Sequence, residues 1–232
     1  MRMITDWLDA NKLWLLLGAG STFGYFWLAE WKQKLNITGR SALCLSILNS
    51  LFGVLFVKIF AFLEGEPGGM SLFGGVFFLP IVYFLGAKIT KRNFAYICDI
   101  FAICTIFTVM CARTNCLLSG CCGGVPIPGT DGLKWPTQMM EIVFYIGLIV
   151  FLGRKVGKPQ YRGRVYPMYL MIYGIFRFLL EFIREKEVQS LFHLSHLWAV
   201  MAFLIGWFLF KRLDNLKMTG KHAVKDKMQS KA

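Results

Sequence analysis

Residues 41–63 read SALCLSILNSLFGVLFVKIFAFL, a run of 23 residues in which Lys58 is the only charged side chain. A helix needs about 20 predominantly apolar residues to cross the hydrocarbon core of a bilayer. Because 56% of the chain is hydrophobic and only 17% is charged, there is too little polar surface to cover a soluble globule of this size. The run therefore indicates a transmembrane helix, and the composition indicates an integral membrane protein.

Six further segments resemble this run in length and character. We therefore expect an all-α integral membrane protein with about seven transmembrane helices. The expected membrane domain covers residues 1–212, and a basic, flexible tail follows over residues 213–232. The expected spans are Leu13–Ala29, Ser41–Leu63, Gly69–Ala87, Asn93–Cys111, Pro136–Gly153, Val165–Arg184 and Phe192–Phe210.

Lys and Arg are concentrated in alternate connections between the expected helices. The connections after the first, third and fifth helices, together with the tail, hold 18 of the 26 basic residues, whereas the other connections are nearly neutral or acidic. Cytoplasmic loops are enriched in Lys and Arg, so the pattern predicts an extracytoplasmic N-terminus and a cytoplasmic C-terminus. The 18 residues are Lys32, Lys34, Arg40, Lys88, Lys91, Arg92, Arg154, Lys155, Lys158, Arg162, Arg164, Lys211, Arg212, Lys217, Lys221, Lys225, Lys227 and Lys231.

The same distribution bears on the partners of the chain. Its net charge of +13 is spread over several connections and is not gathered in the single basic patch that is typical of a nucleic-acid-binding protein. Basic residues beside apolar spans instead favour contact with anionic headgroups. Membrane lipids are therefore expected partners, and nucleic acid is not.

Charged side chains within a span are costly and mark functional candidates. The sixth expected helix carries Tyr173, Arg177, Glu181 and Arg184, whose spacing places them on one helical face. Either Arg177 and Glu181 form an ion pair that holds helices together, or Glu181 holds the guanidinium toward an anionic headgroup, whose oxygens match its planar fork. The other polar residues that the predicted topology places in the outer half of the bilayer are Ser71, Arg113, Gln138 and Glu141.

Two glycine-rich stretches flank these residues on the same side of the membrane. Residues 68–75 read GGMSLFGG, and residues 113–124 read RTNCLLSGCCGG. Irregular backbone at membrane depth is tolerated only where it is buried in protein or lines a cavity, and glycine lets a backbone approach a ligand closely. The two stretches therefore predict a cavity that opens toward the outside.

Three further ionisable residues have simpler interpretations. Asp99, near the cytoplasmic end of the fourth expected helix, is interpreted as a cap or a helix-pairing residue. His193 and His196 begin the seventh expected helix, where interfacial or structural roles are favoured, although either could reach the mouth of the cavity.

Cys116, Cys121 and Cys122 are expected in the outer connection after the fourth helix. Their spacing does not match a standard zinc site, so a structural role or a disulfide is favoured. A catalytic thiol is the alternative, since Arg113 could lower its pKa. No P-loop, dinucleotide fingerprint or set of metal ligands occurs, so neither a metal nor another cofactor is expected.

Several of these motifs, in this order, resemble the prolipoprotein diacylglyceryl transferase family of seven-helix enzymes of the bacterial inner membrane. The likeness runs from about Gly65 to Gly206. The residues that carry it are the stretch 69–75, Asp99, the stretch 113–124, Pro136-Thr137-Gln138 with Glu141, and Tyr173-Gly174-Ile175-Phe176-Arg177 with Glu181 and Arg184.

The family transfers a diacylglyceryl group from phosphatidylglycerol to the cysteine thiol of a secreted precursor protein and releases glycerol phosphate. The resemblance implies these two partners and a place in the bacterial cytoplasmic (inner) membrane. It implies catalytic roles for Arg113, Arg177 and Glu181, with the arginines holding or stabilising the phosphate leaving group. The implied substrate-binding residues are Ser71, Gly74, Gly75, Gly120, Gly124, Gln138, Glu141, Tyr173 and Arg184.

The chain departs from the family pattern at four positions. Phe73 stands where the family usually has His, Cys116 replaces Asn, Cys121 replaces Glu, and Met140 replaces Tyr. Phenylalanine cannot accept a proton, so activation of the acceptor thiol is expected to differ from the family pattern. The candidate groups for a thiol or base in its place are Cys116, Cys121, His196 and Glu141.

Three alternatives stand beside a lipoprotein transferase. The first is a lipid-group transferase with a specialised, non-lipoprotein acceptor. The second is a membrane thiol-redox protein that uses Cys116, Cys121 and Cys122. The third is a relative that binds lipid without turnover.

Overall fold

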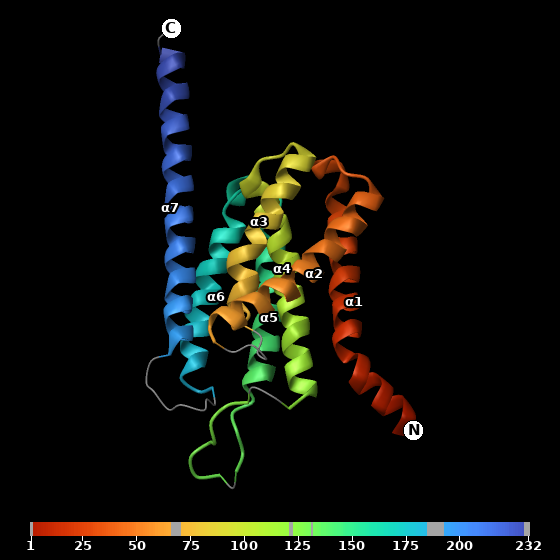
Figure 1. Ribbon diagram of the computed structural model, residues 1–232. Helices are drawn as coiled ribbons and strands as arrows, with labels where there is room; N and C mark the ends of the chain where they lie inside the picture. Colours follow the sequence, from red (N-terminus) through yellow and green to blue (C-terminus); the bar gives the residue numbers. More distant parts are fainter. Residues whose placement is uncertain (1, 66–70, 121–122, 131, 185–192, 230–232) are drawn as a thin grey trace.

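The computed structural model describes residues 2–65, 71–120, 123–130, 132–184 and 193–229, and in this part of the chain the regular structure is helical (Figure 1). Five helices, namely α2, α3, α4, α6 and the first part of α7, are long and apolar enough to cross a membrane, and α5 is a shorter apolar helix. The chain is therefore a multi-pass α-helical membrane protein. The helices are α1 (Arg2–Leu35), α2 (Gly39–Leu63), α3 (Phe73–Thr90), α4 (Phe94–Leu118), α5 (Thr137–Gly153), the 3₁₀ helix η1 (Pro159–Tyr161), α6 (Val165–Glu181) and α7 (Leu194–Gln229).

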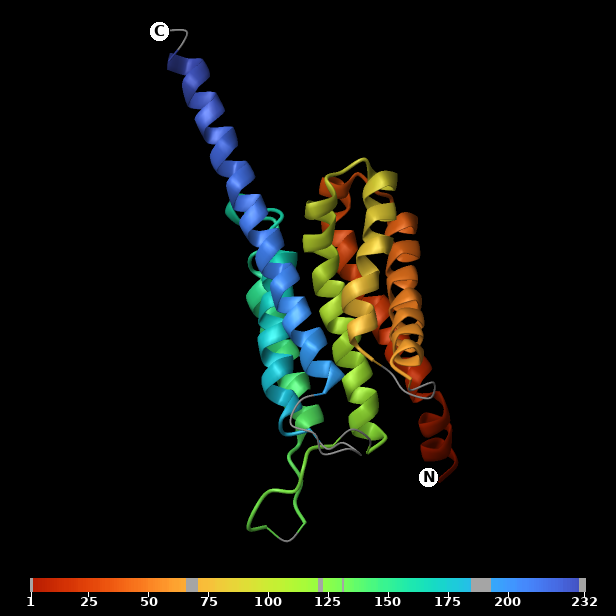
Figure 2. The ribbon, with the colours of Figure 1, turned by 60° about the vertical axis from the view of Figure 1, so that its left-hand side comes forward.

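Helix α4 lies at the centre of the bundle. Helices α1, α2 and α3 lie on one side of it and α5, α6 and α7 on the other (Figure 2). The run from Tyr96 to Ile106 is buried without interruption, as expected of a helix that neighbours surround. Residues on α4 can therefore contact both halves of the bundle.

Local signals fix the ends of the helices around this centre. Thr38 caps α2 by accepting a hydrogen bond from the backbone N–H of Ser41 at 3.2 Å, and Asn93 caps α4 through Ala95 at 2.9 Å. Such short polar side chains satisfy backbone donors that have no partner within the helix. These connections lie at one end of the bundle, and the C-terminal ends of α2, α4 and α6, where the longer connections begin, lie at the other end (Figure 1).

A proline within α3 couples this helix to α6. Pro80 has no backbone N–H, so the carbonyl of Val76 loses its usual partner within the helix. The hydroxyl of Tyr166 donates to that carbonyl at 2.9 Å. The hydrogen bond that proline removes from α3 is thus replaced by one from α6.

Asp99 lies buried on α4 and caps α6 from outside that helix. Its carboxylate accepts hydrogen bonds from the backbone N–H groups of Gly163 and Tyr166, where α6 begins. A carboxylate in this position also interacts favourably with the helix dipole. The interpretation of Asp99 as a capping residue is therefore confirmed.

Asp99→Ala is expected to lower the free energy of unfolding by about 2 kcal/mol, because two buried backbone donors lose their acceptor. Thermal unfolding of the purified protein in detergent would measure this loss. Asp99→Asn keeps one acceptor oxygen and is expected to lose less. A Tm of Asp99→Ala equal to that of the wild type would contradict the capping role.

Three helices, α1, α4 and α7, extend well beyond the expected spans. Helix α1 extends beyond Leu13–Ala29 at both ends, and α4 continues past Cys111 to Leu118. The expectation that Cys116 lies in a connection is therefore wrong, because it lies within α4. Helix α7 continues to Gln229, so residues 213–229 of the expected tail are helical, and the expectation of a flexible segment is wrong for them.

Candidate functional site

Three helices bring oppositely charged side chains together at the end of the bundle that holds the longer connections. The Nε atom of Arg113 on α4 lies 2.8 Å from Oε2 of Glu141 on α5. Arg177 on α6 approaches the other oxygen of Glu141 at 3.5 Å and, through its second terminal nitrogen, lies 2.9 Å from Glu181. Arg184 extends this set, with 4.0 Å between its guanidinium and Glu181. We call these five residues the charge cluster.

The charge cluster is buried at its centre. The exposed fractions of Arg113, Glu141, Arg177 and Glu181 lie between 2 and 3%. Charges taken out of water are costly unless they are paired, and here positive and negative groups alternate along the chain of contacts. The five residues carry a formal excess of one positive charge, so the cluster favours an anion.

The local sequence explains why these side chains meet. Arg177 and Glu181 are four residues apart and therefore lie one above the other on α6. Glu141 lies in the first turn and a half of α5, after Pro136 has set the start of that helix. The rings of Phe144 and Phe176 stack with centroids 3.6 Å apart, which holds α5 and α6 side by side.

Aromatic side chains cover the charge cluster from α3 and α6. The ring of Phe73 packs edge-to-face on Tyr173, with centroids 5.9 Å apart. The guanidinium of Arg177 lies 5.7 Å from the centroid of the Phe73 ring, within the range of a cation–π contact. The position at which the family usually has His is therefore in contact with the cluster, and its phenylalanine provides a π face in place of a titratable group.

Two of the predicted glycines are required by close backbone approach. A Cβ atom on Gly74 would lie 2.1 Å from the carbonyl oxygen of Phe56, so glycine allows α3 to contact α2. A Cβ atom on Gly124 would lie 2.5 Å from Trp135 and 2.8 Å from the carbonyl oxygen of Ile183. The connection after α4 thereby docks on the end of α6, beside Arg184.

The other predicted substrate-binding residues are spread over the same end of the bundle. Gly120 has a φ of +65° and follows the end of α4, which explains the glycine without a ligand. Gly75 is buried between α2 and α3, and Ser71 is half-buried with its N–H donating to the carbonyl of Val57 at 3.2 Å. Gln138 is buried in the first turn of α5.

The candidate thiols and His196 differ in their relation to the charge cluster: Cys116 lies within electrostatic reach of Arg113, whereas His196 lies to one side. The ring of His196 packs on Phe178 and Phe182, at 5.2 and 4.7 Å. These phenylalanines lie about 100° and 140° around α6 from Arg177, so the histidine is on a neighbouring flank of that helix. Cys116 is half-buried on α4. Cys121 and Cys122 lie outside the described residues.

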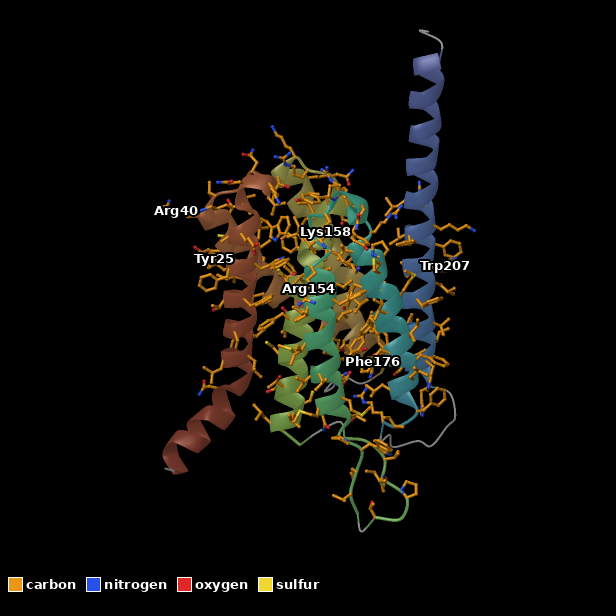
Figure 3. All side chains as sticks on the ribbon, turned by 180° about the vertical axis from the view of Figure 1, so that it is seen from behind. Tyr25, Arg40, Arg154, Lys158, Phe176 and Trp207 are labelled. Atoms are coloured by element: carbon orange, nitrogen blue, oxygen red, sulfur yellow. The ribbon has the colours of Figure 1, made fainter. Side chains whose placement is uncertain are left out.

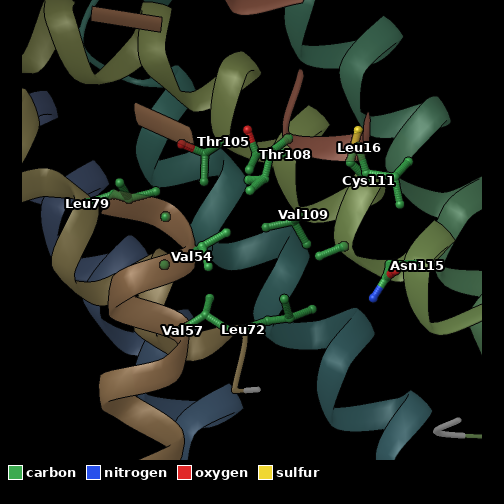
Figure 4. A pocket seen from close by; sticks show the side chains of 14 residues that line it. Leu16, Val54, Val57, Leu72, Leu79, Thr105, Thr108, Val109, Cys111 and Asn115 are labelled. Carbon is green, nitrogen blue, oxygen red and sulfur yellow. The ribbon is translucent and has the colours of Figure 1, made fainter. Parts of the chain in front are cut away.

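A narrow apolar cavity of about 50 Å³ lies between α1, α2, α3 and α4 (Figure 4). Gly75 and Asn115 are among the residues that line it. Arg113 is absent from this lining and pairs with α5, so α4 separates the cavity from the charge cluster. A hydrocarbon group suits such a lining better than a charged group does.

Tyr145 belongs to the surroundings of the charge cluster and was missed in the sequence. It is fully buried on α5, and its hydroxyl lies within electrostatic reach of Glu141, Arg113 and Arg177. The signal that could have found it is its spacing of four residues from Glu141, which places both on one face of α5.

Taken together, the fold and the site define a multi-pass membrane protein with a buried cluster of paired charges. The family model of prolipoprotein diacylglyceryl transferase matches residues 36–212. The chain belongs to this family.

Relatives of this chain carry the same family name. The chain is 34% identical over 133 residues to a phosphatidylglycerol–prolipoprotein diacylglyceryl transferase from Mannheimia succiniciproducens. The aligned region covers 53% of this chain and 49% of that protein. It is 32% identical over 119 residues to phosphatidylglycerol–prolipoprotein diacylglyceryl transferase 2 from Clostridium perfringens, and the aligned region covers 45% of this chain and 46% of that protein. These matches span about half the length of the relatives. A relative of the same name from Pasteurella multocida is 29% identical over 194 residues, and the aligned region covers 76% of this chain and 71% of that protein.

Proposed function

We propose that this protein transfers a diacylglyceryl group from phosphatidylglycerol to a cysteine thiol of a secreted lipoprotein precursor. The observation that carries the proposal is the buried charge cluster, in which Arg113 and Arg177 from different helices converge on one carboxylate. The names of the family and of the relatives support the same donor and acceptor.

The proposed reaction divides its work between the acceptor and the arginines. The acceptor sulfur bonds to the glycerol carbon that carries the phosphate, and the bond from that carbon to the phosphate oxygen breaks. The electron pair leaves with glycerol phosphate, and the thiol proton passes to a base. Arg113 and Arg177 stabilise the negative charge that grows on the leaving phosphate. Glu141 and Glu181 hold the two guanidinium groups in place.

The proposed topology places this site near the outer surface of the bacterial cytoplasmic membrane. The seven spans rest on the apolar runs, and an N-terminus outside with a C-terminus in the cytoplasm rests on the distribution of Lys and Arg. Arg40 and Lys158 lie toward the same end of the bundle, as this topology requires (Figure 3). In it, residues 1–212 form the membrane domain, and residues 213–232 form a basic segment on the cytoplasmic side, where anionic lipids attract it.

Within the proposed site, the substrate-binding residues fall into two groups. Glu141 and Arg184 lie beside the phosphate, with Tyr173 one helical turn further toward the middle of the bundle, whereas Gly74 and Gly124 shape the site by allowing close helix contacts. The remaining proposed contributors to substrate binding are Ser71, Gly75, Gly120 and Gln138.

A direct assay tests the proposed function. Purified protein is mixed with vesicles that contain labelled phosphatidylglycerol and with a peptide that carries an acceptor cysteine. We expect a labelled thioether product, and a peptide with Ser in place of Cys serves as the acceptor control. Arg113→Ala is expected to lower the rate by about 10²-fold, as for loss of one preorganised donor at a developing oxyanion. Failure of the folded wild-type protein to form the thioether would exclude this function.

A further inference from the structure

Three tyrosine hydroxyls are buried near the charge cluster without a hydrogen-bond partner in the described chain. Tyr145, Tyr169 and Tyr173 each have an exposed fraction of 0%, and no described protein group pairs with their oxygen atoms. Buried polar groups are nearly always hydrogen-bonded in native proteins, so each exception requires an explanation. Three such hydroxyls on neighbouring turns of α5 and α6 indicate an interior position that a polar group from outside the chain can occupy.

These hydroxyls lie on one side of the charge cluster. Tyr145 follows Glu141 by four residues on α5, and Tyr173 precedes Arg177 by four residues on α6, which is about 6 Å along the helix axis. Because α5 and α6 run in opposite directions, both tyrosines lie toward the middle of the bundle from the cluster. Tyr169 lies one further turn in the same direction, with its ring 5.7 Å from that of Tyr173.

Other buried tyrosines of the same bundle have their partners. The hydroxyl of Tyr166 donates to the carbonyl of Val76, and that of Tyr83 pairs with Thr105 and Asn49. Tyr166 is on the same helix as Tyr169 and Tyr173. Among the buried tyrosines, the lack of a partner is therefore confined to the three on the inner side of the cluster, while Trp31, Ser50 and Trp198 also hold unpartnered buried atoms elsewhere in the described chain.

The chemistry of a phospholipid matches this arrangement. If the phosphate lies at the arginines, the next polar groups toward the middle of the bilayer are the two ester carbonyls of the diacylglyceryl group. A carbonyl oxygen accepts up to two hydrogen bonds and donates none, and a tyrosine hydroxyl donates one. Two carbonyls can therefore accept from all three hydroxyls.

We propose that Tyr145, Tyr169 and Tyr173 bind the ester carbonyls of the donor lipid and thereby select a diacyl over a dialkyl glycerol backbone. This inference rests on the proposed function, because it assumes that the phosphate of the donor lies at Arg113 and Arg177. These hydroxyls are positioning groups. They hold the glycerol backbone so that the carbon that carries the phosphate faces the acceptor thiol.

Ether-linked phosphatidylglycerol provides the test, because it keeps the phosphate and the chains but lacks both carbonyls. The transfer assay is run with diester and with diether phosphatidylglycerol in otherwise identical vesicles. We expect the wild type to prefer the diester donor by about tenfold or more, as the loss of two or three neutral hydrogen bonds predicts. Tyr145→Phe, Tyr169→Phe and Tyr173→Phe should each lower the diester rate by about threefold to fivefold and leave the diether rate within twofold.

Tyr166→Phe is the matched control, because it removes a hydroxyl from α6 that already has a protein partner. Its ratio of diester to diether rates should equal that of the wild type. Equal use of both donors by the wild type would overturn the inference, and so would tyrosine variants that slow both donors alike. A second experiment measures lipid binding alone, so that the inference can be tested independently of catalytic turnover. Nanodiscs with equal amounts of the two lipids should yield protein enriched in the diester form, and equal retention of both lipids would overturn the inference even where no thioether forms.

Discussion

Arg177→Gln is expected to lower the rate of diacylglyceryl transfer by about 10²- to 10³-fold, the loss that follows removal of a preorganised donor at a developing negative charge. Arg177 contacts Glu141 and Glu181 and is covered by Phe73. A neutral amide in its place cannot balance the charge that forms on the leaving phosphate. The rate of thioether formation, measured with phosphatidylglycerol in excess, reports this loss.

A conservative variant separates the charge of Arg177 from its shape. Arg177→Lys keeps the positive charge but loses the planar fork that can contact two oxygens at once, so we expect it to retain a small part of the rate. Arg154→Gln removes an exposed charge at the other end of α5 and serves as the control, with a rate close to wild type. An Arg177→Gln protein that folds and transfers at the wild-type rate would place the phosphate elsewhere.

Glu141→Ala is expected to lower the free energy of unfolding by about 3–5 kcal/mol, because removal of one partner from a buried ion pair leaves an uncompensated charge. The effect is large here, since both oxygens of Glu141 are engaged and two guanidinium groups, those of Arg113 and Arg177, lose their shared partner. Thermal unfolding in detergent, or resistance to a denaturing detergent, measures the change.

Two variants complete this experiment. Glu141→Gln keeps the size of the side chain and one of its two acceptor oxygens, so it should lie between Ala and the wild type. Glu30→Ala removes an exposed carboxylate from α1 and should leave the unfolding temperature nearly unchanged. Equal stability of Glu141→Ala and the wild type would mean that the two arginines find other partners.

The fold could largely be predicted because the membrane restricts the choices. Apolar runs of about 20 residues must become helices in a bilayer, since every backbone group needs a partner within the chain. The ends of the helices were harder to predict from the sequence. Hydropathy detects where hydrocarbon contact ends, whereas the hydrogen bonds of a helix continue into polar sequence, as at Leu118 in α4 and Gln229 in α7. Cys116 was misplaced for this reason.

The charged part of the candidate site could be predicted from the sequence for a similar reason. A charge such as Glu141 inside an apolar run has few structural explanations, so it indicates a site even without a fold. Tyrosine gives no such signal, because it is equally common in an apolar core. The spacing of Tyr145 from Glu141 places both on one face of α5, but only the structure shows that the hydroxyls of Tyr145 and Tyr169 are buried and have no partner in the described chain.

The length of α5 has a consequence for the membrane around the proposed site. With 17 residues, it measures about 26 Å, a few ångströms less than the roughly 30 Å hydrocarbon core of a typical bilayer. A span that is too short draws the two leaflets closer together beside it. Thinning next to α5 would lower the surrounding headgroups toward the depth of Glu141. A donor lipid would then have only a short way to move from the leaflet into the site.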